Sequence, residues 1–159
     1  KETIKDILSR IMKFTEEVAK KLNNLLEKNY DAEKGYQDAA ERIENPTMKD
    51  FLKEQARKRY DFGHEIKTEI KNYGEQPDKG GSAKGTVHRA WMDLKAAVAS
   101  SSEEQVMEEV QRGEQSAINE YNEVISETSL PPSVQQTLTK QRDQIIEAQQ
   151  SAKNFEVVS

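Results

Sequence analysis

The sequence contains no cysteine and only two histidines, His64 and His88, among its 159 residues. The lack of cysteine excludes disulfides, thiolate metal sites and cysteine nucleophiles. No Glu precedes either histidine by three residues, because Asp61 and Gly85 stand in those places. The chain therefore lacks the Glu-x-x-His pairs that hold carboxylate-bridged di-iron centres in helix bundles.

Long apolar runs and clusters of basic residues are also missing. No apolar segment approaches the roughly 20 residues that span a bilayer, and no secretory signal opens the chain. The formal net charge is −5, from 24 Lys and Arg against 29 Asp and Glu, whereas phosphate binding needs cations gathered on one face. We therefore expect a cytoplasmic protein with neither a nucleic-acid nor a membrane partner.

The hydrophobic residues that are present recur at helical spacing. They make up 34% of the chain, a share that would favour disorder if they were scattered. Instead they follow one another at intervals of three and four, which is typical of amphipathic helices. No segment alternates with the period of two that indicates a strand. The pattern predicts an all-α protein of one domain.

Helix breakers divide the chain into long segments. Asn45-Pro46-Thr47 interrupts the first pattern, Gly74 ends the second, and Pro131-Pro132 turns the chain before the last. Thr47 with Asp50, and Ser100 to Ser102 with Glu103 and Glu104, are expected to cap helices. The predicted long helices run from near Glu2 or Thr15 to Ile43, from Met48 to Tyr73, from Ser102 to Glu127 and from Pro132 to Asn154, with a short helix over 86–99.

This order predicts two antiparallel helical hairpins joined by a crossover that contains the short extra helix. Such a crossover matches the ferritin-like four-helix bundle rather than a simple up-down bundle. Met12 opens a stretch typical of a natural start. We therefore assign residues 12–156 to a single bundle domain and interpret residues 1–11 as an extension, a fusion or a processed piece.

Residues 1–11 carry an apolar stripe of their own, formed by Ile4, Ile7, Leu8 and Ile11. The stripe has helical spacing, so it is predicted to lengthen the first helix and to bury one side of it. If these side chains are exposed instead, they form an apolar surface that mediates association.

Several polar residues occupy inward-facing positions near the middles of the predicted helices. A predicted structural layer comprises Asn29, Arg59, Glu114, Gln141 and Gln149. In the interpretation that we favour, Arg59 pairs with Glu114 and the amides complete a hydrogen-bond network that fixes helix register. No catalytic or cofactor-binding residue is predicted.

The alternative is a degenerate metal site for Fe, Mn or Zn that uses Glu33, Glu114 and His64. A di-metal site needs several carboxylates and imidazoles, whereas this layer offers few, and Arg59 repels a cation. His64 shares a helical face with Asp61 and lies near Glu65 and Glu69, but a solvated charged face is the simpler interpretation. A third hypothesis is a small-molecule pocket within the bundle.

Five segments resemble an uncharacterised bacterial family of four-helix-bundle proteins in the ferritin-like superfamily, which carries a domain of unknown function. They are 22–36, 59–66, 112–117, 130–132 and, most specifically, the stretch from His88 to Lys95, His-Arg-Ala-Trp-Met-Asp-Leu-Lys. The resemblance covers residues 12–155 and implies a ferritin-like fold.

The first predicted helix also resembles that of bacterioferritin, in which a Glu ligates iron. Here Asn29 stands at that position, Gln149 stands where related sequences carry His, and Glu114 alone matches a ligand position. The resemblance thus implies a fold without iron storage or ferroxidase activity. We expect a non-enzymatic protein that acts through self-assembly or protein interaction, and the general character of the family suggests a role in stress.

Overall fold

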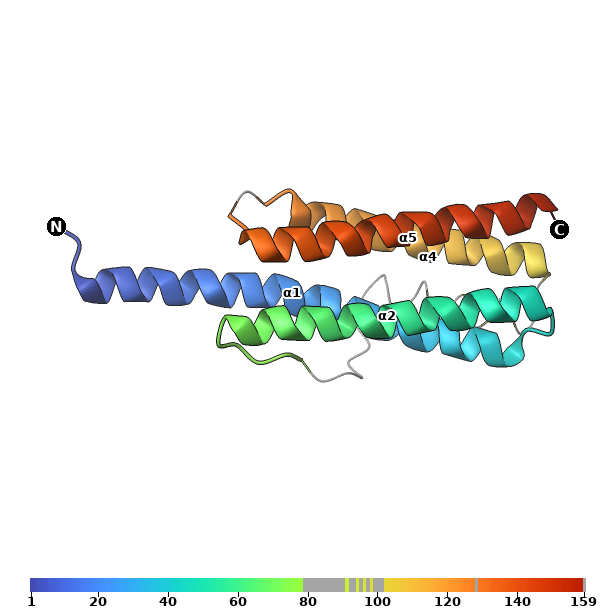
Figure 1. The fold of residues 1–159 in the computed structure, drawn as a ribbon, viewed down its shortest axis with the longest axis horizontal. Helices are drawn as coiled ribbons and strands as arrows, with labels where there is room; N and C mark the ends of the chain where they lie inside the picture. Colours follow the sequence, from blue (N-terminus) through green and yellow to red (C-terminus); the bar gives the residue numbers. More distant parts are fainter. Residues whose placement is uncertain are drawn as a thin grey trace.

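The protein is an all-α bundle of two helical hairpins (Figure 1). The structure is a computed structural model that describes residues 1–78, 91, 94, 96, 98, 102–127 and 129–158. No strand occurs among these residues. The long helices are α1 (Ile4–Arg42), α2 (Pro46–Asn72), α4 (Glu103–Ile125) and α5 (Pro132–Val158). No helix in this part of the chain combines the length and the apolar character needed to cross a membrane.

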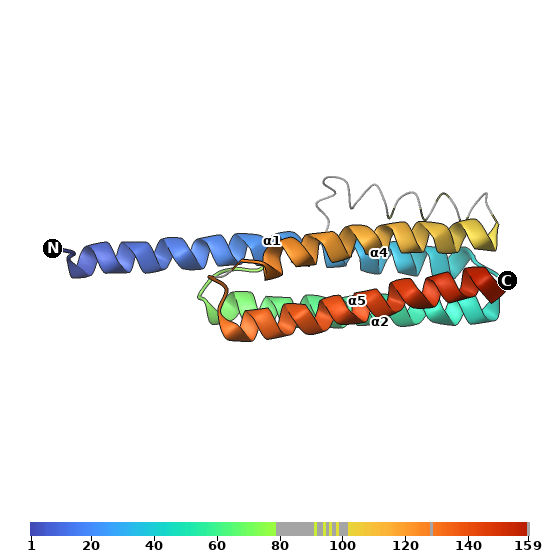
Figure 2. The same ribbon diagram turned by 90° about the horizontal axis from the view of Figure 1, so that it is seen from above.

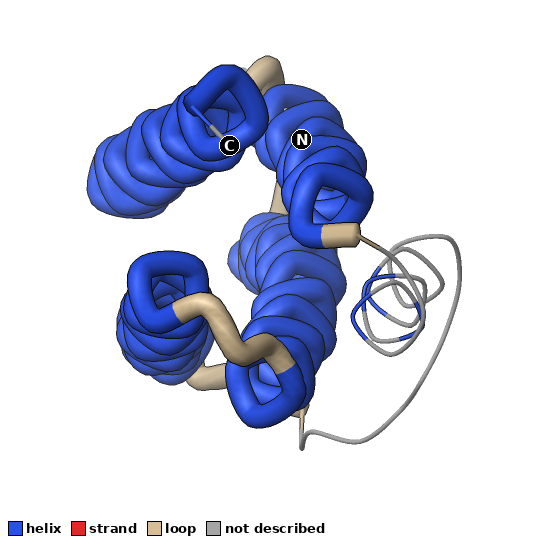
Figure 3. Tube along the Cα trace, turned by 90° about the vertical axis from the view of Figure 1, so that its right-hand side faces the viewer, coloured by secondary structure: helices blue, strands red, loops and turns tan. Residues whose placement is uncertain are grey.

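Each long helix packs chiefly against its neighbour in sequence. Contacts between α1 and α2 and between α4 and α5 outnumber those between the hairpins, where α1 meets α4 and α2 meets α5. Helices α2 and α4 run in the same direction, so the end of α2 and the start of α4 lie at opposite ends of the bundle (Figure 2). Viewed along the bundle, the four helices lie at the corners of a quadrilateral (Figure 3).

Most of the short helix predicted over 86–99 lies outside the described residues, as does His88. Trp91, Leu94, Ala96 and Val98 are described, and all four are helical. The side chains of Trp91 and Leu94 are buried, and both belong to the hydrophobic core.

Local sequence sets the helix ends. Thr3 caps α1 by accepting from the backbone N–H of Asp6, whose carboxylate accepts from the N–H of Thr3 in return. Thr15 is therefore an interior residue of α1. At α2 the cap is Asn45 rather than the predicted Thr47: its Oδ1 accepts from the N–H groups of Thr47 and Met48, and Pro46 fills the first helical position. Because an Asn side chain caps as well as Thr does, it places the helix start before the proline.

The end of α2 and the start of α4 are also set by residues that favour helix termini. Gly74 follows the end of α2 with φ of 73°, a left-handed conformation that glycine adopts without strain. Ser102 caps α4 in a capping box with Gln105. Within the predicted run Ser100 to Ser102, the first two residues lie outside the described part.

The hydrophobic core is divided into two clusters. One gathers around Tyr36, Met48, Leu52, Trp91 and Met107. The other gathers around Leu22, Leu26, Ile66, Tyr121 and Leu138. Along α1, α2 and α4 the change from one cluster to the other falls at a buried polar residue, namely Asn29, Arg59 and Glu114. These three helices therefore carry a polar layer between two apolar halves.

The N-terminal part of α1 extends past the ends of the other helices (Figures 1 and 2). The prediction that residues 1–11 lengthen the first helix is correct, because α1 begins at Ile4. The prediction that their stripe buries one side is wrong. Ile4 is 77% exposed, Leu8 55% and Ile11 52%, because no described helix reaches far enough to cover them.

Candidate functional site

Arg59 of α2 and Glu114 of α4 form an ion pair at the centre of the bundle. The Nη2 atom of Arg59 lies 2.5 Å from Oε1 of Glu114, and the two side chains are 2% and 0% exposed. The second guanidinium nitrogen, Nη1, donates to Oδ1 of Asn29 on α1 at 3.0 Å. Three helices from both hairpins therefore meet at one cation.

The network continues from Asn29 to the fourth helix through Tyr121. Asn29 Nδ2 donates to the Tyr121 hydroxyl at 2.8 Å, and that hydroxyl donates to Oε1 of Gln141 on α5 at 2.7 Å. Gln141 Nε2 in turn donates to Oε1 of Glu65 at 3.1 Å and to the carbonyl of Phe62 at 3.3 Å. The polar layer thus consists of Arg59, Glu114, Asn29, Tyr121 and Gln141, and its outer end reaches an exposed carboxylate.

Burial governs the ionisation of this layer. Removal from water raises the pKa of Glu114, and the positive charge of Arg59 and the nearby Tyr36 hydroxyl lower it in part. Burial likewise raises the pKa of Tyr121 to about 12, against the lowering effects of Arg59 and Asn29. Tyr121 therefore remains a neutral phenol, and its hydroxyl group donates a hydrogen bond to Gln141.

Trp91 from the crossover packs beside the ion pair. The ring centroids of Trp91 and Tyr36 lie 4.7 Å apart, and Cζ of Arg59 lies 6.0 Å from the ring centroid of Trp91. The indole rests against Gly35 on α1 and Gly113 on α4, so close that a Cβ on Gly35 would stand 2.9 Å from Cβ of Trp91. Glycine at these two positions makes room for the indole between helices of different hairpins.

Three buried polar atoms in this region make no hydrogen bond of good geometry with any described residue, although the Tyr36 hydroxyl lies close enough to Glu114 to lower the pKa of that carboxyl. They are the Tyr36 hydroxyl, Nε1 of Trp91 and Oε2 of Glu114. Buried polar atoms are normally paired, and each unpaired one costs about 1–3 kcal/mol. Arg59 is hydrogen-bonded to both Asn29 and Glu114, and the Tyr36 hydroxyl is a further neighbour that stabilises the charged form of Glu114.

The three residues of the alternative metal site differ in burial and in their partners. Glu114 is paired with Arg59 in the core. Glu33 is half-buried at the surface and accepts from Gln37 Nε2 at 3.2 Å, while His64 is exposed with its ring 4.5 Å from that of Tyr60. The described part of the chain contains no group of three or more His, Cys, Asp or Glu side chains placed to hold a metal ion.

The acidic residues near His64 have other partners. Asp61 pairs with Arg57 at 2.8 Å, and Glu65 accepts from Gln141. Glu69 accepts from the hydroxyls of Ser133 and Thr137 on α5. These carboxylates contribute to the surface of α2 and to its contact with α5, rather than converging on the imidazole.

Gln149 lies outside the polar layer, in contrast to the sequence-based expectation. It is half-buried on α5, and its Nε2 donates to Oε1 of Gln115 at 2.9 Å and to the carbonyl of Gln111 at 3.3 Å. The inward positions at this level are occupied by Ala148 and Ala152. Gln149 therefore borders the buried face of α5 and does not lie at its centre.

Tyr36 and Tyr121 were not singled out from the sequence, and their hydroxyls lie beside the ion pair and in the polar layer, respectively. A signal was present, because Tyr36 follows Asn29 by seven residues and Tyr121 follows Glu114 by seven. Residues seven apart lie on nearly the same side of a helix. Each hydroxyl is therefore directed into the bundle on the face that carries the polar residue.

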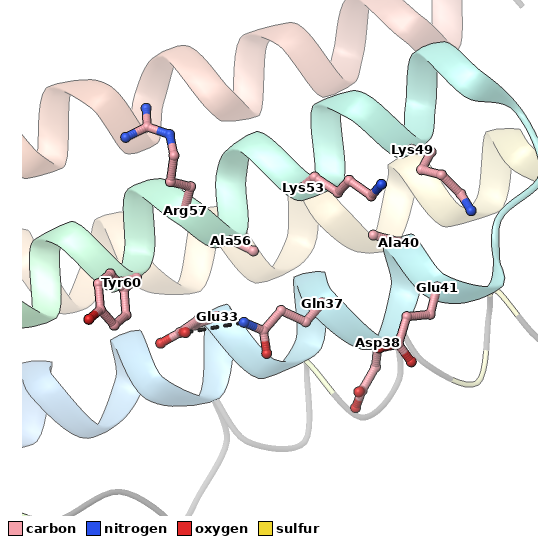
Figure 4. A pocket seen from close by; sticks show the side chains of 10 residues that line it. All are labelled: Glu33, Gln37, Asp38, Ala40, Glu41, Lys49, Lys53, Ala56, Arg57 and Tyr60. Atoms are coloured by element: carbon pink, nitrogen blue, oxygen red, sulfur yellow. Dashed lines mark hydrogen bonds between the residues drawn. The ribbon is translucent and has the colours of Figure 1, made fainter.

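A surface groove of about 830 Å³ lies between α1 and α2 (Figure 4). Ala40 and Ala56 are among the residues that line it. Acidic and amide side chains come from α1 and basic ones from α2, with Tyr60 at one end: Glu33, Gln37, Asp38, Glu41, Lys49, Lys53 and Arg57. Charges of both signs on an open surface give no convergent set of groups for one substrate.

Comparison with protein families identifies a single domain. The model of the family described as domain of unknown function (DUF2383) matches residues 17–127. The match begins near the point where α1 enters the bundle and ends just after α4. No curated protein matches the chain.

Proposed function

The chain belongs to the DUF2383 family, and from that premise we propose that it acts without catalysis, by self-association through the protruding end of α1. We call residues 4–17 the protruding segment. The observation that carries the proposal is its exposed apolar face, formed by Ile4, Ile7, Leu8, Ile11, Met12 and Phe14. Contiguous apolar surface of this kind marks an interaction site in soluble proteins.

The exposed apolar face is concentrated in one place. Outside the protruding segment, the large hydrophobic side chains exposed in the described residues are Tyr60 on α2 and Ile146 on α5. These stand singly on different helices, as scattered surface hydrophobics commonly do. Association through the protruding segment accounts for the whole of the concentrated patch.

The interior of the bundle also supports a non-catalytic role. The central carboxylate, Glu114, is held by Arg59, whose guanidinium cannot lose its charge. A metal ion bound at Glu114 would have to displace or neighbour that cation, and Glu33 and Glu65 lie nearer the surface. The polar layer is therefore best suited to aligning the helices.

Sedimentation equilibrium of the full chain tests the proposal. We expect a dimer or larger assembly, and a shift to monomer for a variant with Leu8→Ser, Ile11→Ser and Met12→Ser. Ile146→Ser is the matched control, because it removes an exposed apolar side chain of similar size from α5. A natural protein that stays monomeric at millimolar concentration overturns the proposal, as does an assembly that the triple variant leaves unchanged.

We also infer that the bundle belongs to the ferritin-like superfamily. The support is topological, since two hairpins joined by a long crossover characterise that group. An experimental structure whose helices superpose on a ferritin-like bundle in the same order supports the inference. Superposition that requires the helices to be reordered contradicts it.

A further inference from the structure

The protruding segment continues the inward face of α1 without a change of phase. Two rows of residues at seven-residue intervals run along the helix: Ile4, Ile11, Val18, Leu25, Ala32 and Ala39 in one, and Leu8, Thr15, Leu22, Asn29, Tyr36 and Ile43 in the other. From Val18 onward every member of both rows is buried. Before Val18, Ile4, Leu8 and Ile11 are exposed and Thr15 is half-buried. A sustained seven-residue repeat is the pattern by which one helix packs along another.

Contacts with α1 mark where the bundle ends. Asn23 accepts from the backbone N–H of Asp78 at 2.7 Å and donates to the carbonyl of Gln76 at 3.2 Å, and Lys21 pairs with Glu127 at 3.2 Å. The segments that follow α2 and α4 therefore reach α1 at residues 21–23. The protruding segment lies beyond this level and has a length of about 21 Å at 1.5 Å per residue.

We propose that two copies of the chain pair their protruding segments antiparallel and face to face, with Ile11 near the two-fold axis. This inference rests on the proposed function and adds the partner and its orientation. The partner is a second copy because the surface can complement itself in size and pattern, as a two-fold interface requires.

A parallel pairing is excluded by the position of the bundle. The face that carries Ile4, Leu8 and Ile11 is the same face that packs on the other helices from Val18 onward. A parallel partner on that face would place its own bundle where the first bundle already lies. An antiparallel partner places the two bundles at opposite ends of the paired segments.

In the antiparallel register, apolar side chains of one copy face apolar side chains of the other, and opposite charges lie close together. With Ile11 opposite itself, Leu8 lies opposite Phe14, so exposed apolar residues meet on both sides of the axis, while Ile4 reaches the level of the buried Val18, where the partner's bundle begins. The same register brings Lys5 of one copy to within a turn of Glu16 of the other, twice by symmetry.

The absence of native cysteine allows a direct test by disulfide trapping. Three single variants of the full chain are made, Leu8→Cys, Ile11→Cys and Phe14→Cys, with Ile146→Cys as a control on the exposed surface of α5. Each is oxidised alone, and Leu8→Cys is also oxidised together with Phe14→Cys. Disulfides require Cα atoms roughly 4.4–6.8 Å apart, so the pattern of covalent dimers reports the register.

We expect Ile11→Cys to form a dimer with itself, and Leu8→Cys to form one with Phe14→Cys but not with itself. In the antiparallel register two Leu8 positions are separated by about 9 Å along the axis, at 1.5 Å per residue. Self-dimers of both Leu8→Cys and Phe14→Cys would overturn the antiparallel arrangement. A non-covalent dimer without any of these cross-links would also overturn it and leave the proposed self-association standing. A monomer in sedimentation would overturn both.

Discussion

Arg59 and Glu114 join the two hairpins across the centre of the bundle, with Nη2 and Oε1 2.5 Å apart and both side chains buried. Their energetic roles are unequal. The carboxyl can neutralise itself by binding a proton, whereas the guanidinium keeps its charge at any pH that the protein survives. Loss of Glu114 therefore leaves a buried cation, and loss of Arg59 leaves a group that can become neutral.

This asymmetry predicts the outcome of single substitutions. We expect Glu114→Ala to lower the free energy of unfolding by about 3–5 kcal/mol, as removal of one partner from a buried pair does. Arg59→Met should cost less, and the double variant Arg59→Met with Glu114→Leu should be more stable than Glu114→Ala alone. Urea unfolding followed by circular dichroism measures each difference.

A surface pair provides the control for these substitutions. Arg57 contacts Glu54 and Asp61 on the exposed face of α2, and Arg57→Ala should cost about 1 kcal/mol or less. If Glu114→Ala costs no more than Arg57→Ala, the central pair contributes no more to stability than a surface pair does.

The raised pKa of Glu114 gives a pH dependence with a definite sign. Burial raises the pKa above its ordinary value of 4.5, so the folded chain holds this proton to a higher pH than the unfolded chain does. The corresponding contribution to stability is complete below pH 4.5 and declines as pH rises through the folded pKa. We expect the stability of the natural protein minus that of Glu114→Gln to decrease over this range. Urea titrations at several pH values measure it, and an increase with pH would mean that Arg59 outweighs burial.

Replacement by alanine is expected to change stability in opposite directions at Gly35, which contacts Trp91, and at Gly63, which does not. A Cβ on Gly35 would stand 2.9 Å from Cβ and 3.0 Å from Cε3 of Trp91, whereas a Cβ on Gly63 would meet Leu26 Cδ1 at an ordinary 3.6 Å. Gly35→Ala should therefore destabilise by about 1–3 kcal/mol through overpacking. Gly63→Ala should stabilise by up to about 1 kcal/mol through helix propensity. Thermal unfolding compares them, and equal effects would contradict the packing of Trp91 against Gly35.

Metal content is expected to be below one ion per chain. Protein purified without a chelator or a metal-binding tag should carry no stoichiometric Fe, Mn or Zn, because Arg59 occupies the carboxylate of Glu114. Elemental analysis by mass spectrometry measures this. Stoichiometric metal that is lost in Glu114→Ala but retained in Glu120→Ala would establish the alternative site, since Glu120 is a surface residue paired with Lys28.

The helices and the ion pair could be anticipated because their signals are local or periodic. Pro46, Gly74 and Pro132 mark helix ends through backbone chemistry alone. Polar residues on otherwise apolar stripes pointed to Asn29, Arg59, Glu114 and Gln141, and those four lie in one hydrogen-bonded layer.

Other features could not be predicted because they depend on how separate helices pack together. Ile4 and Leu8 are exposed because α2, α4 and α5 end before they reach this part of α1. The hydrophobic pattern of one helix does not indicate how long the helices packed beside it are. Gln149 stands next to the buried Ala148, and the sequence pattern did not distinguish the edge of the buried face of α5 from its centre. The hydroxyls of Tyr36 and Tyr121 were overlooked because the aromatic rings alone justified their burial.

The position of Trp91 bears on how the two hairpins come together. Helices α1 and α4 make few direct contacts, and the indole fills the space between Gly35 on one and Gly113 on the other. Trp91 belongs to neither hairpin, since it comes from the chain that links them. Trp91 is thus a structural part of the contact between the two hairpins on this side of the bundle, although neither hairpin contains it.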